Sequence, residues 1–329
     1  QINYNLGNKT TSENTFIYLI NSNVDFNGAD ITIANNGLGI YQEGASLVQG
    51  YNTLNVGDNA AGIYGFATNV SNVGNVIVQG KNAVGLIGED SNITNNAGNV
   101  IATTSDGSVG IYSLLKAPTA STNLVNNGDL NISGDQSIGI FASTLDSTGA
   151  SIGTTFVQNN NIITLGNASG INNATIGIFG TEGVDILNAV GSQISGGNNV
   201  VGIYSEKGTV KHDSAINLGD NSVGIYISAG NATIDSGASI SVGSTGAVAL
   251  YANARGTIIN DSSSISAGTG SVLGYSKDSG TLLDNRGNLS IGTESVGFYS
   301  SGGEITNSGN LSSVGDGVVF FYGNNGKIA

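Results

Sequence analysis

A short apolar pattern recurs along the whole chain, and its clearest copy is Ser222-Val223-Gly224-Ile225-Tyr226. An aliphatic residue, a glycine, a second aliphatic residue and an aromatic residue follow one another, with polar residues on either side. Most copies are spaced by 22 to 25 residues. A regular period in this range predicts stacked units, because each unit can bury its apolar face only against its neighbours. The copies begin at Thr15, Leu38, Ala61, Val84, Val109, Ile138, Ile176, Val201, Val223, Val248, Val272, Val296 and Val318.

Each repeat contains three short segments with the period-2 alternation that is typical of β-strands. In residues 201–220 these segments are 201–204, 209–211 and 215–218, and polar residues separate them. Helical repeats are disfavoured, because the apolar residues lack a 3.6-residue period and glycines lie inside the segments. The sequence therefore predicts an all-β fold, a right-handed parallel β-helix of about 13 three-strand coils with a few protruding loops; the handedness is taken from known solenoids. We expect residues 1–329 to form a single segment of a longer rod.

The alternation also predicts which side chains face inward. The first and third residues of each copy should face the core, so that the third residues stack as a ladder that includes Ile203, Ile225 and, in the last copy, Phe320. The glycine and the aromatic residue should then share the outer face. The aromatic rings either stack into the structure as a ladder or form an exposed stripe for protein or glycan contact. The members of this possible stripe are Tyr204, Tyr226, Tyr251, Tyr275 and Tyr299.

Two polar patterns predict turns. Asn-x-Gly segments such as Asn72-Val73-Gly74 and Asn285-Arg286-Gly287 should turn the chain sharply, because Asn and Gly tolerate positive φ. Gly-Asp pairs recur at Gly57-Asp58, Gly134-Asp135, Gly219-Asp220 and Gly315-Asp316, and stacking would align them as a spaced acidic row. Calcium needs several oxygen ligands on one ion, and the nonapeptide calcium repeat is absent, so turn formation is the favoured role.

Two spacings are longer than the rest, and the extra residues must loop out of the coils. The first long spacing contains the only proline of the chain, and the second contains two excursions, 144–153 and 167–174. Such loops often carry binding residues, but tolerated surface insertions are an equally good interpretation. The candidate binding residues are Lys116, Pro118, Leu145, Asp146, Asn167 and Asn172.

Composition excludes several classes of partner and site. The formal net charge of −14 repels phosphate backbones and anionic head groups, so nucleic acid and lipid surfaces are not expected partners. No 18-residue apolar run is present that could span a membrane as a helix. With one His and no Cys, we expect no metal site and no cofactor.

The chain offers little catalytic chemistry. Its one cluster of ionisable groups, Glu206-Lys207 followed by Lys211-His212-Asp213, is interpreted as a solvated face. Many β-helix proteins are polysaccharide lyases or glycosidases, and these need convergent carboxylates or metal-binding acids. Acidic residues here are few and scattered, so we expect no enzyme and no catalytic residues; a carbohydrate-active enzyme is the least favoured alternative.

At the level of whole repeats the chain contains units such as AINLGDNSVGIYISAGNATI and NLSIGTESVGFYSSGGEITNSGNLS. These resemble the passenger repeats of the large fusobacterial autotransporter adhesins, from about Thr15 to Tyr322. The resemblance implies type V secretion, tethering to the outer membrane by a C-terminal barrel, and an extracellular, cell-surface location. It also implies virulence-associated cell adhesion and coaggregation with other oral bacteria, through host proteins or glycans that include galactose-type sugars.

The sequence thus predicts a monomeric, non-enzymatic segment of a bacterial surface adhesin. A pure spacer of a larger adhesin, with the binding located elsewhere, remains an open alternative.

Overall fold

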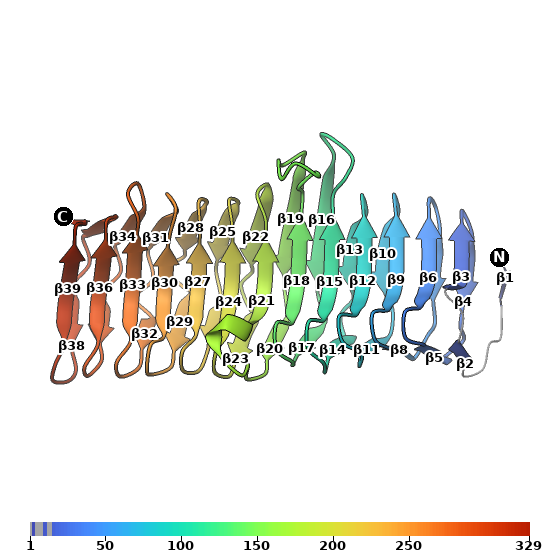
Figure 1. Ribbon diagram of the computed structural model, residues 1–329, viewed down its shortest axis with the longest axis horizontal. Helices are drawn as coiled ribbons and strands as arrows, with labels where there is room; N and C mark the ends of the chain where they lie inside the picture. Colours follow the sequence, from blue (N-terminus) through green and yellow to red (C-terminus); the bar gives the residue numbers. More distant parts are fainter. Residues whose placement is uncertain (1, 4–8, 12–14) are drawn as a thin grey trace. The chain divides into compact units, whose positions relative to one another are not determined.

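The computed structural model describes residues 2–3, 9–11 and 15–329, and strands make up almost all of its regular structure (Figure 1). The strands wind into about 13 coils, and nearly all of them pair in parallel with their counterparts in the next coil, so the predicted right-handed parallel β-helix is confirmed. The chain divides into two compact units, unit 1 over residues 1–164 and unit 2 over residues 165–329. The organisation of residues 1–329 as a single segment stays a prediction.

Unit 1 contains three sets of strands. The strands with the repeated apolar pattern form the GIY sheet: β3 (Thr15–Ile20), β6 (Leu38–Glu43), β9 (Ala61–Phe66), β12 (Val84–Glu89), β15 (Val109–Leu114) and β18 (Ile138–Ser143). The second strands of the coils, here called the Asn strands, are β1 (Ile2–Asn3), β4 (Asn23–Asp25), β7 (Leu47–Gln49), β10 (Asn69–Asn72), β13 (Asn92–Asn95), β16 (Ser121–Asn126) and β19 (Thr154–Asn159). The third strands are β2 (Lys9–Thr11), β5 (Asp30–Ile33), β8 (Thr53–Val56), β11 (Asn75–Val78), β14 (Val100–Thr103), β17 (Asp129–Ile132) and β20 (Ile162–Leu165).

Unit 2 repeats this arrangement. Its GIY sheet contains β21 (Thr175–Gly180), β24 (Val200–Ser205), β27 (Val223–Ile227), β30 (Val248–Ala252), β33 (Val272–Lys277), β36 (Val296–Ser301) and β39 (Val319–Asn324). Its Asn strands are β22 (Val184–Asn188), β25 (Thr209–His212), β28 (Asn231–Ile234), β31 (Thr257–Asn260), β34 (Leu282–Asn285), β37 (Glu304–Asn307) and β40 (Lys327–Ile328). Its third strands are β23 (Gln193–Gly196), β26 (Ala215–Asn217), β29 (Ser239–Val242), β32 (Ile265–Ala267), β35 (Leu289–Ile291) and β38 (Leu311–Ser313). A single 3₁₀ turn, η1 (Ile171–Asn173), is the one helical element in the described residues, none of which belongs to a helix able to span a bilayer.

In-register pairing stacks the third residues of the GIY strands on one another. Ile203 pairs with Ile225, and Ile225 pairs with Leu250; all three side chains are fully buried. Each such side chain stabilises the fold by about 1.5–3 kcal/mol relative to an exposed one. The predicted aliphatic ladder is therefore confirmed.

The expected alternation is wrong at the first two residues of the GIY strands. In β12 the glycine Gly85 and the following Leu86 are both buried, whereas the first residue, Val84, is only half-buried. A Cβ atom on Gly85 would lie 2.7 Å from the carbonyl oxygen of Gly110 in the next coil, closer than real contacts allow. The glycine thus belongs to the interior, and the first aliphatic residue lies outward with the aromatic residue.

The last repeat differs by one residue from the predicted register. In β39, Phe321 pairs with Phe298, and Tyr322 pairs with Tyr299. The ladder position is therefore Phe321 and not Phe320, and the aromatic position is Tyr322. A phenylalanine, Phe320, stands where most other copies have glycine, and this difference concealed the register in the sequence.

A second internal column is made of asparagine. At the ends of the Asn strands of unit 1, Asn72, Asn95, Asn126 and Asn159 are fully buried. Each Nδ2 donates to the Oδ1 of the next residue, at 2.7, 2.7 and 2.8 Å along the column. In unit 2 the column continues from Asn260 to Asn285 to Asn307 with distances of 2.7 Å. Burying these amides is tolerable because each finds a partner in the adjacent coil.

This column changes the interpretation of the Asn-x-Gly segments. Asn72 and Asn285 are buried strand residues, and neither they nor Gly74 and Gly287 have positive φ, so the predicted reason for these glycines is wrong. A Cβ atom on Gly74 would collide with the carbonyl oxygen of Tyr51. The glycine is needed because a neighbouring coil passes close to its backbone.

Candidate functional site

The aromatic residues of the GIY strands form a column on the outer face of each unit. In unit 2 the rings of Tyr204, Tyr226 and Tyr251 lie nearly parallel, with centroids 4.6 and 4.7 Å apart. All three side chains are half-buried. The two interpretations of the stripe therefore both hold in part: the rings stack as a ladder, and the ladder lies on the surface. Stacked rings cover one another's faces, so mainly ring edges and hydroxyls reach solvent.

The stacking changes at Tyr275. Its ring makes an angle of 89° with that of Tyr251 and of 71° with that of Tyr299, at centroid distances of 4.9 and 4.8 Å. The neighbouring rings therefore do not cover Tyr275 with a parallel face. An uncovered aromatic face is the part of a ring that contacts the C–H face of a sugar or an apolar side chain.

Burial keeps two hydroxyls of the tyrosine column neutral near pH 7. Burial raises the pKa of Tyr204 to about 12, and burial likewise raises the pKa of Tyr251 well above its usual value. The hydroxyl oxygen of Tyr226 accepts a hydrogen bond of 2.8 Å from Asn253 Nδ2. The column therefore presents neutral hydroxyls beside apolar ring edges.

Unit 1 carries a notch that the sequence analysis did not identify. Its cavity of about 310 Å³ lies where the centroids of Tyr41 and Tyr64 separate to 5.7 Å, and it is lined by Leu38, Tyr41, Tyr64 and Phe66. The Tyr41 hydroxyl donates to Glu43 Oε2 over 3.0 Å, and the Tyr64 hydroxyl donates to Glu89. Burial and then the bond to Glu43 raise the pKa of Tyr41 to about 12. The Tyr-x-Glu spacing could have indicated the Tyr41–Glu43 pair, because strand residues two apart share a face, but not the notch itself.

Backbone N–H groups of the loop after β15 hold it against Asp90 of the preceding coil. Lys116 N and Ala117 N donate to Asp90 Oδ1 over 2.6 and 2.7 Å, and Lys116 Nζ lies 2.9 Å from Glu89 Oε2. Lys116 and Pro118 are exposed. Figure 1 shows this loop, between β15 and β16, standing out beyond the turns of neighbouring coils of unit 1.

The excursion 144–153 is also a closed structure. Leu145 and Ser151 form an antiparallel bridge. Asp146 Oδ1 accepts hydrogen bonds from the N–H groups of Thr148 and Ala150 over 2.8 and 3.0 Å. The hydroxyl of Thr148 and these N–H groups hold the pKa of Asp146 below its usual range. Leu145 and Asp146 thus help to close the loop, and these polar contacts lie within it or at its base, where Leu145 N donates to Ser143 Oγ.

The two asparagines predicted in the excursion 167–174 lie in different surroundings. Asn167 Oδ1 accepts a hydrogen bond of 2.8 Å from Asn198 N, so Asn167 belongs to a turn that stacks on the next coil. Asn172 lies in η1 and is exposed. The protruding part is therefore shorter than predicted. The binding roles of all six loop residues stay predictions.

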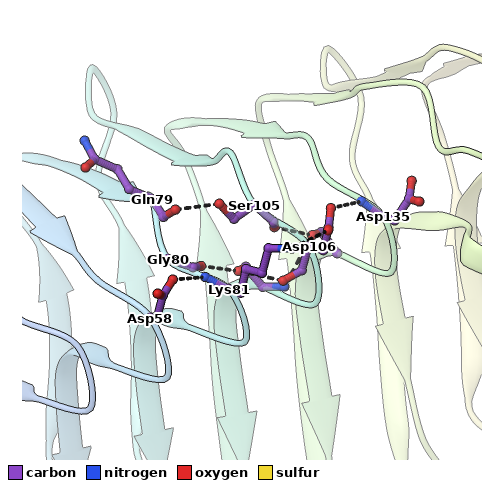
Figure 2. Close-up of polar contacts among 9 residues, drawn as sticks. Asp58, Gln79, Gly80, Lys81, Ser105, Asp106 and Asp135 are labelled. Atoms are coloured by element: carbon purple, nitrogen blue, oxygen red, sulfur yellow. Dashed lines mark hydrogen bonds and ion pairs between the residues drawn. The ribbon is translucent and has the colours of Figure 1, made fainter.

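The Gly-Asp turns align as expected and are shown for unit 1 in Figure 2. Asp58 Oδ1 accepts from Lys81 N over 2.8 Å, and Asp106 Oδ1 accepts from Asp135 N over 3.1 Å. Lys81 Nζ also lies 3.2 Å from Asp106 Oδ2. The predicted turns are confirmed at Asp58 and Asp135. The carboxylates of Asp58 and Asp106 each accept a hydrogen bond from a backbone N–H of the following coil, and these bonds hold successive turns together. Lys81 interrupts the acidic row.

The cluster around the single histidine corrects the sequence interpretation. Lys211 is exposed and lies 2.5 Å from Asp213 and 3.6 Å from Asp235. His212, in contrast, is fully buried and pairs with Asn188, so it occupies the asparagine column. The prediction of a solvated histidine is wrong, because the alternation of β25 points His212 inward.

The described residues contain no group of three His, Asp or Glu side chains placed to hold a metal ion. What the surface offers is aromatic edges, neutral hydroxyls and, at the notch, two carboxylates that accept from phenols. This arrangement can contact apolar groups and hydrogen-bond to neutral or cationic ones. Comparison of the chain with known protein families, with curated proteins and with solved structures finds no match.

Proposed function

We propose that the chain is a non-enzymatic segment of a bacterial surface adhesin that mediates attachment to host cells or to partner bacteria. The observation that carries the proposal is the outer face of the GIY sheet, where half-buried tyrosines present neutral hydroxyls and ring edges in coil after coil. Tyrosine contributes large contact area at low entropic cost and is enriched at binding surfaces. The β-helix alone is compatible with an adhesin or a spacer.

The proposed partners are host cell-surface proteins or glycans, with galactose-type sugars and other oral bacteria among them. The net charge of −14 disfavours polyanionic partners, and the neutral tyrosine column suits uncharged sugar hydroxyls or protein surfaces. An extracellular location with anchoring to the outer membrane follows from the repeat resemblance and belongs to the same proposal.

The absence of catalysis is part of the proposal. Glycoside cleavage needs two carboxyl groups that face a common substrate. The two carboxylates beside the notch, Glu43 and Glu89, each accept a hydrogen bond from a tyrosine of the wall, and Glu89 also pairs with Lys116. We expect no release of reducing or unsaturated ends when the chain is incubated with host polysaccharides.

A binding assay with surface variants tests the proposal. The purified chain should bind epithelial cells or oral partner bacteria, with galactose and other sugars as competitors. Tyr204→Leu/Tyr226→Leu/Tyr251→Leu keeps apolar volume but removes rings and hydroxyls, and should weaken binding at least fivefold if this column is the contact surface. Thr233→Leu, exposed on β28 and away from the column, is the matched control.

Deletion of residues 144–153 separates the remaining alternatives. A loss of binding in this variant, with an unchanged melting temperature, would place the contact on the loop instead of the column. Wild-type binding by both the triple tyrosine variant and the deletion variant would place the contact at another part of this chain. A chain that binds no cell surface at all would favour the spacer.

A further inference from the structure

Two successive positions of the asparagine column of unit 2, His212 and Ile234, are not asparagine. Asn188 on β22 pairs with His212 on β25, and His212 pairs with Ile234 on β28. All three side chains are fully buried. The imidazole therefore has an amide on one side along the column and an aliphatic side chain on the other.

The hydrogen bonds of His212 suit one protonation state. Its Nδ1 lies 3.1 Å from Asn188 Nδ2, and its Nε2 lies 3.2 Å from the carbonyl oxygen of Ser239. The Ser192 hydroxyl lies 2.9 Å from Asn188 Oδ1 and 2.7 Å from the carbonyl oxygen of Ala189, and the amide nitrogen of Asn188 is directed at the imidazole. A neutral ring with its proton on Nε2 satisfies all of these groups, since Nδ1 then accepts and Nε2 donates.

We propose that His212 makes this coil of unit 2 acid-sensitive: a proton on Nδ1 places two donors face to face at Asn188, breaks the column and opens the segment 209–217. No member of the asparagine column elsewhere can respond in this way, because an amide does not titrate in this range. Opening can stay local, because a solenoid coil is held only by its immediate neighbours.

The charges around His212 do not compensate a buried imidazolium. Asp185 on β22 accepts from Thr209 N over 3.1 Å, and Lys211 forms ion pairs with Asp213 and Asp235. Of these groups, the Asp213 carboxylate favours the charged ring, but burial outweighs it and lowers the pKa of His212 to about 4. Ile234 offers no polar group on the far side.

The direction of the effect follows from linkage. The pKa of an unfolded histidine is about 6.5, so the open segment binds a proton more readily than the closed one. The stabilisation is fully present above about pH 6.5 and is lost as the pH falls towards 4. Between pH 7 and pH 4.5 the opening equilibrium constant of the coil should rise on the order of 10²-fold.

Two measurements on the whole chain test this device. Because the sequence has one histidine, its imidazole resonances are unambiguous in a titration followed by NMR. Hydrogen exchange of peptides covering 209–217, compared at each pH between wild type and His212→Asn, measures the opening. The asparagine variant places a second amide beside Asn188 and should lose the extra acid-dependent exchange, while residues 84–103 of unit 1 should exchange alike in both proteins.

A folded-state titration of His212 near 6.5 would overturn the proposal. The same acid-dependent exchange of 209–217 in the His212→Asn variant would also overturn it. The NMR titration uses the wild-type chain alone, so the proposal stays testable even if the variant folds poorly. Neither outcome depends on whether the chain binds a cell surface.

Discussion

At the scale of single residues, two irregular neighbours in unit 2 compensate each other. In β33 the order of the inward residues is reversed, so that Leu273 is buried at the usual glycine position and Gly274 stands at the ladder position. The next strand has Phe298 where most copies have Ile or Leu. A Cβ atom on Gly274 would lie 2.7 Å from Phe298 Cδ1, so the large ring fills the space that the glycine leaves.

This compensation predicts a coupling energy between the two sites. Gly274→Ala should destabilise unit 2 by about 1–3 kcal/mol, because the new methyl group meets the phenylalanine ring. Phe298→Leu should cost a similar amount, about 1–3 kcal/mol, through the cavity that it opens. In the double variant the methyl group no longer meets the ring and only its contact with Leu283 Cδ1 remains, so the loss should be smaller than the sum. Urea unfolding of the four proteins measures this, and strictly additive losses would contradict the packing described.

The residue scale is also where the sequence was least informative. The ladder isoleucines were predictable, because apolar residues recur in phase with the repeat. The inward glycine was not, because simple alternation assigns it outward and only the close approach of Gly110 to Gly85 reveals the true constraint. His212 was misassigned because Lys211 and Asp213, its charged neighbours in the sequence, indicate only that the outer face of β25 is exposed. They do not indicate what the inner face, where His212 lies, contacts.

At the scale of strands, the side chains that join one coil to the next explain the in-register stacking. The asparagine column inside and the aspartate or asparagine acceptors at the turns both link equivalent positions of successive coils. A shift of one residue would direct the buried amides to the outside and break every such bond. Register is thus specified by hydrogen bonds as well as by apolar burial.

The asparagine column predicts a large difference between two similar substitutions. Asn95→Ala should destabilise unit 1 by about 2–4 kcal/mol, because it leaves Asn72 Nδ2 and Asn126 Oδ1 buried without these partners. Asn123→Ala, at an exposed position of β16, should change the stability by less than about 0.5 kcal/mol. Thermal unfolding of both variants gives the comparison. Equal losses would show that the column contributes little.

The sequence predicted the strands better than the site. The thirteen GIY strands occur where the apolar pattern places them, apart from the shift at Phe321. The Asn-x-Gly segments do separate the second and third strands as predicted, and Gly98 has the expected positive φ. That their asparagines include buried strand residues was not predictable, because the same residue types serve turns and buried amide columns. The notch in unit 1 depends on the separation of Tyr41 from Tyr64, and no spacing in the sequence encodes that distance.

At the scale of the whole molecule, the coils of each unit depend mainly on their neighbours. Stability in such a structure is close to a sum of local terms, so damage to one coil need not unfold distant ones. A single unfolding free energy for the chain is therefore not expected to describe it fully.

A charge in the ladder tests this locality. Ile225→Asp places an unpaired carboxylate among fully buried aliphatic side chains and should cost roughly 3–5 kcal/mol. Hydrogen exchange should accelerate in residues 201–252 and remain unchanged in residues 61–103 of unit 1. Wild-type melting of this variant would show that the inward assignment is wrong, and uniform acceleration along the chain would argue against local stability.

The acceptors at the turns have a further consequence for how such a chain can change over generations. Asp58, Asp106 and their equivalents present nearly the same docking edge to whatever coil follows. Duplication or excision of one whole repeat would therefore leave compatible partners on both sides of the junction. Insertion or deletion of one coil at a time therefore requires no new contact surface between coils.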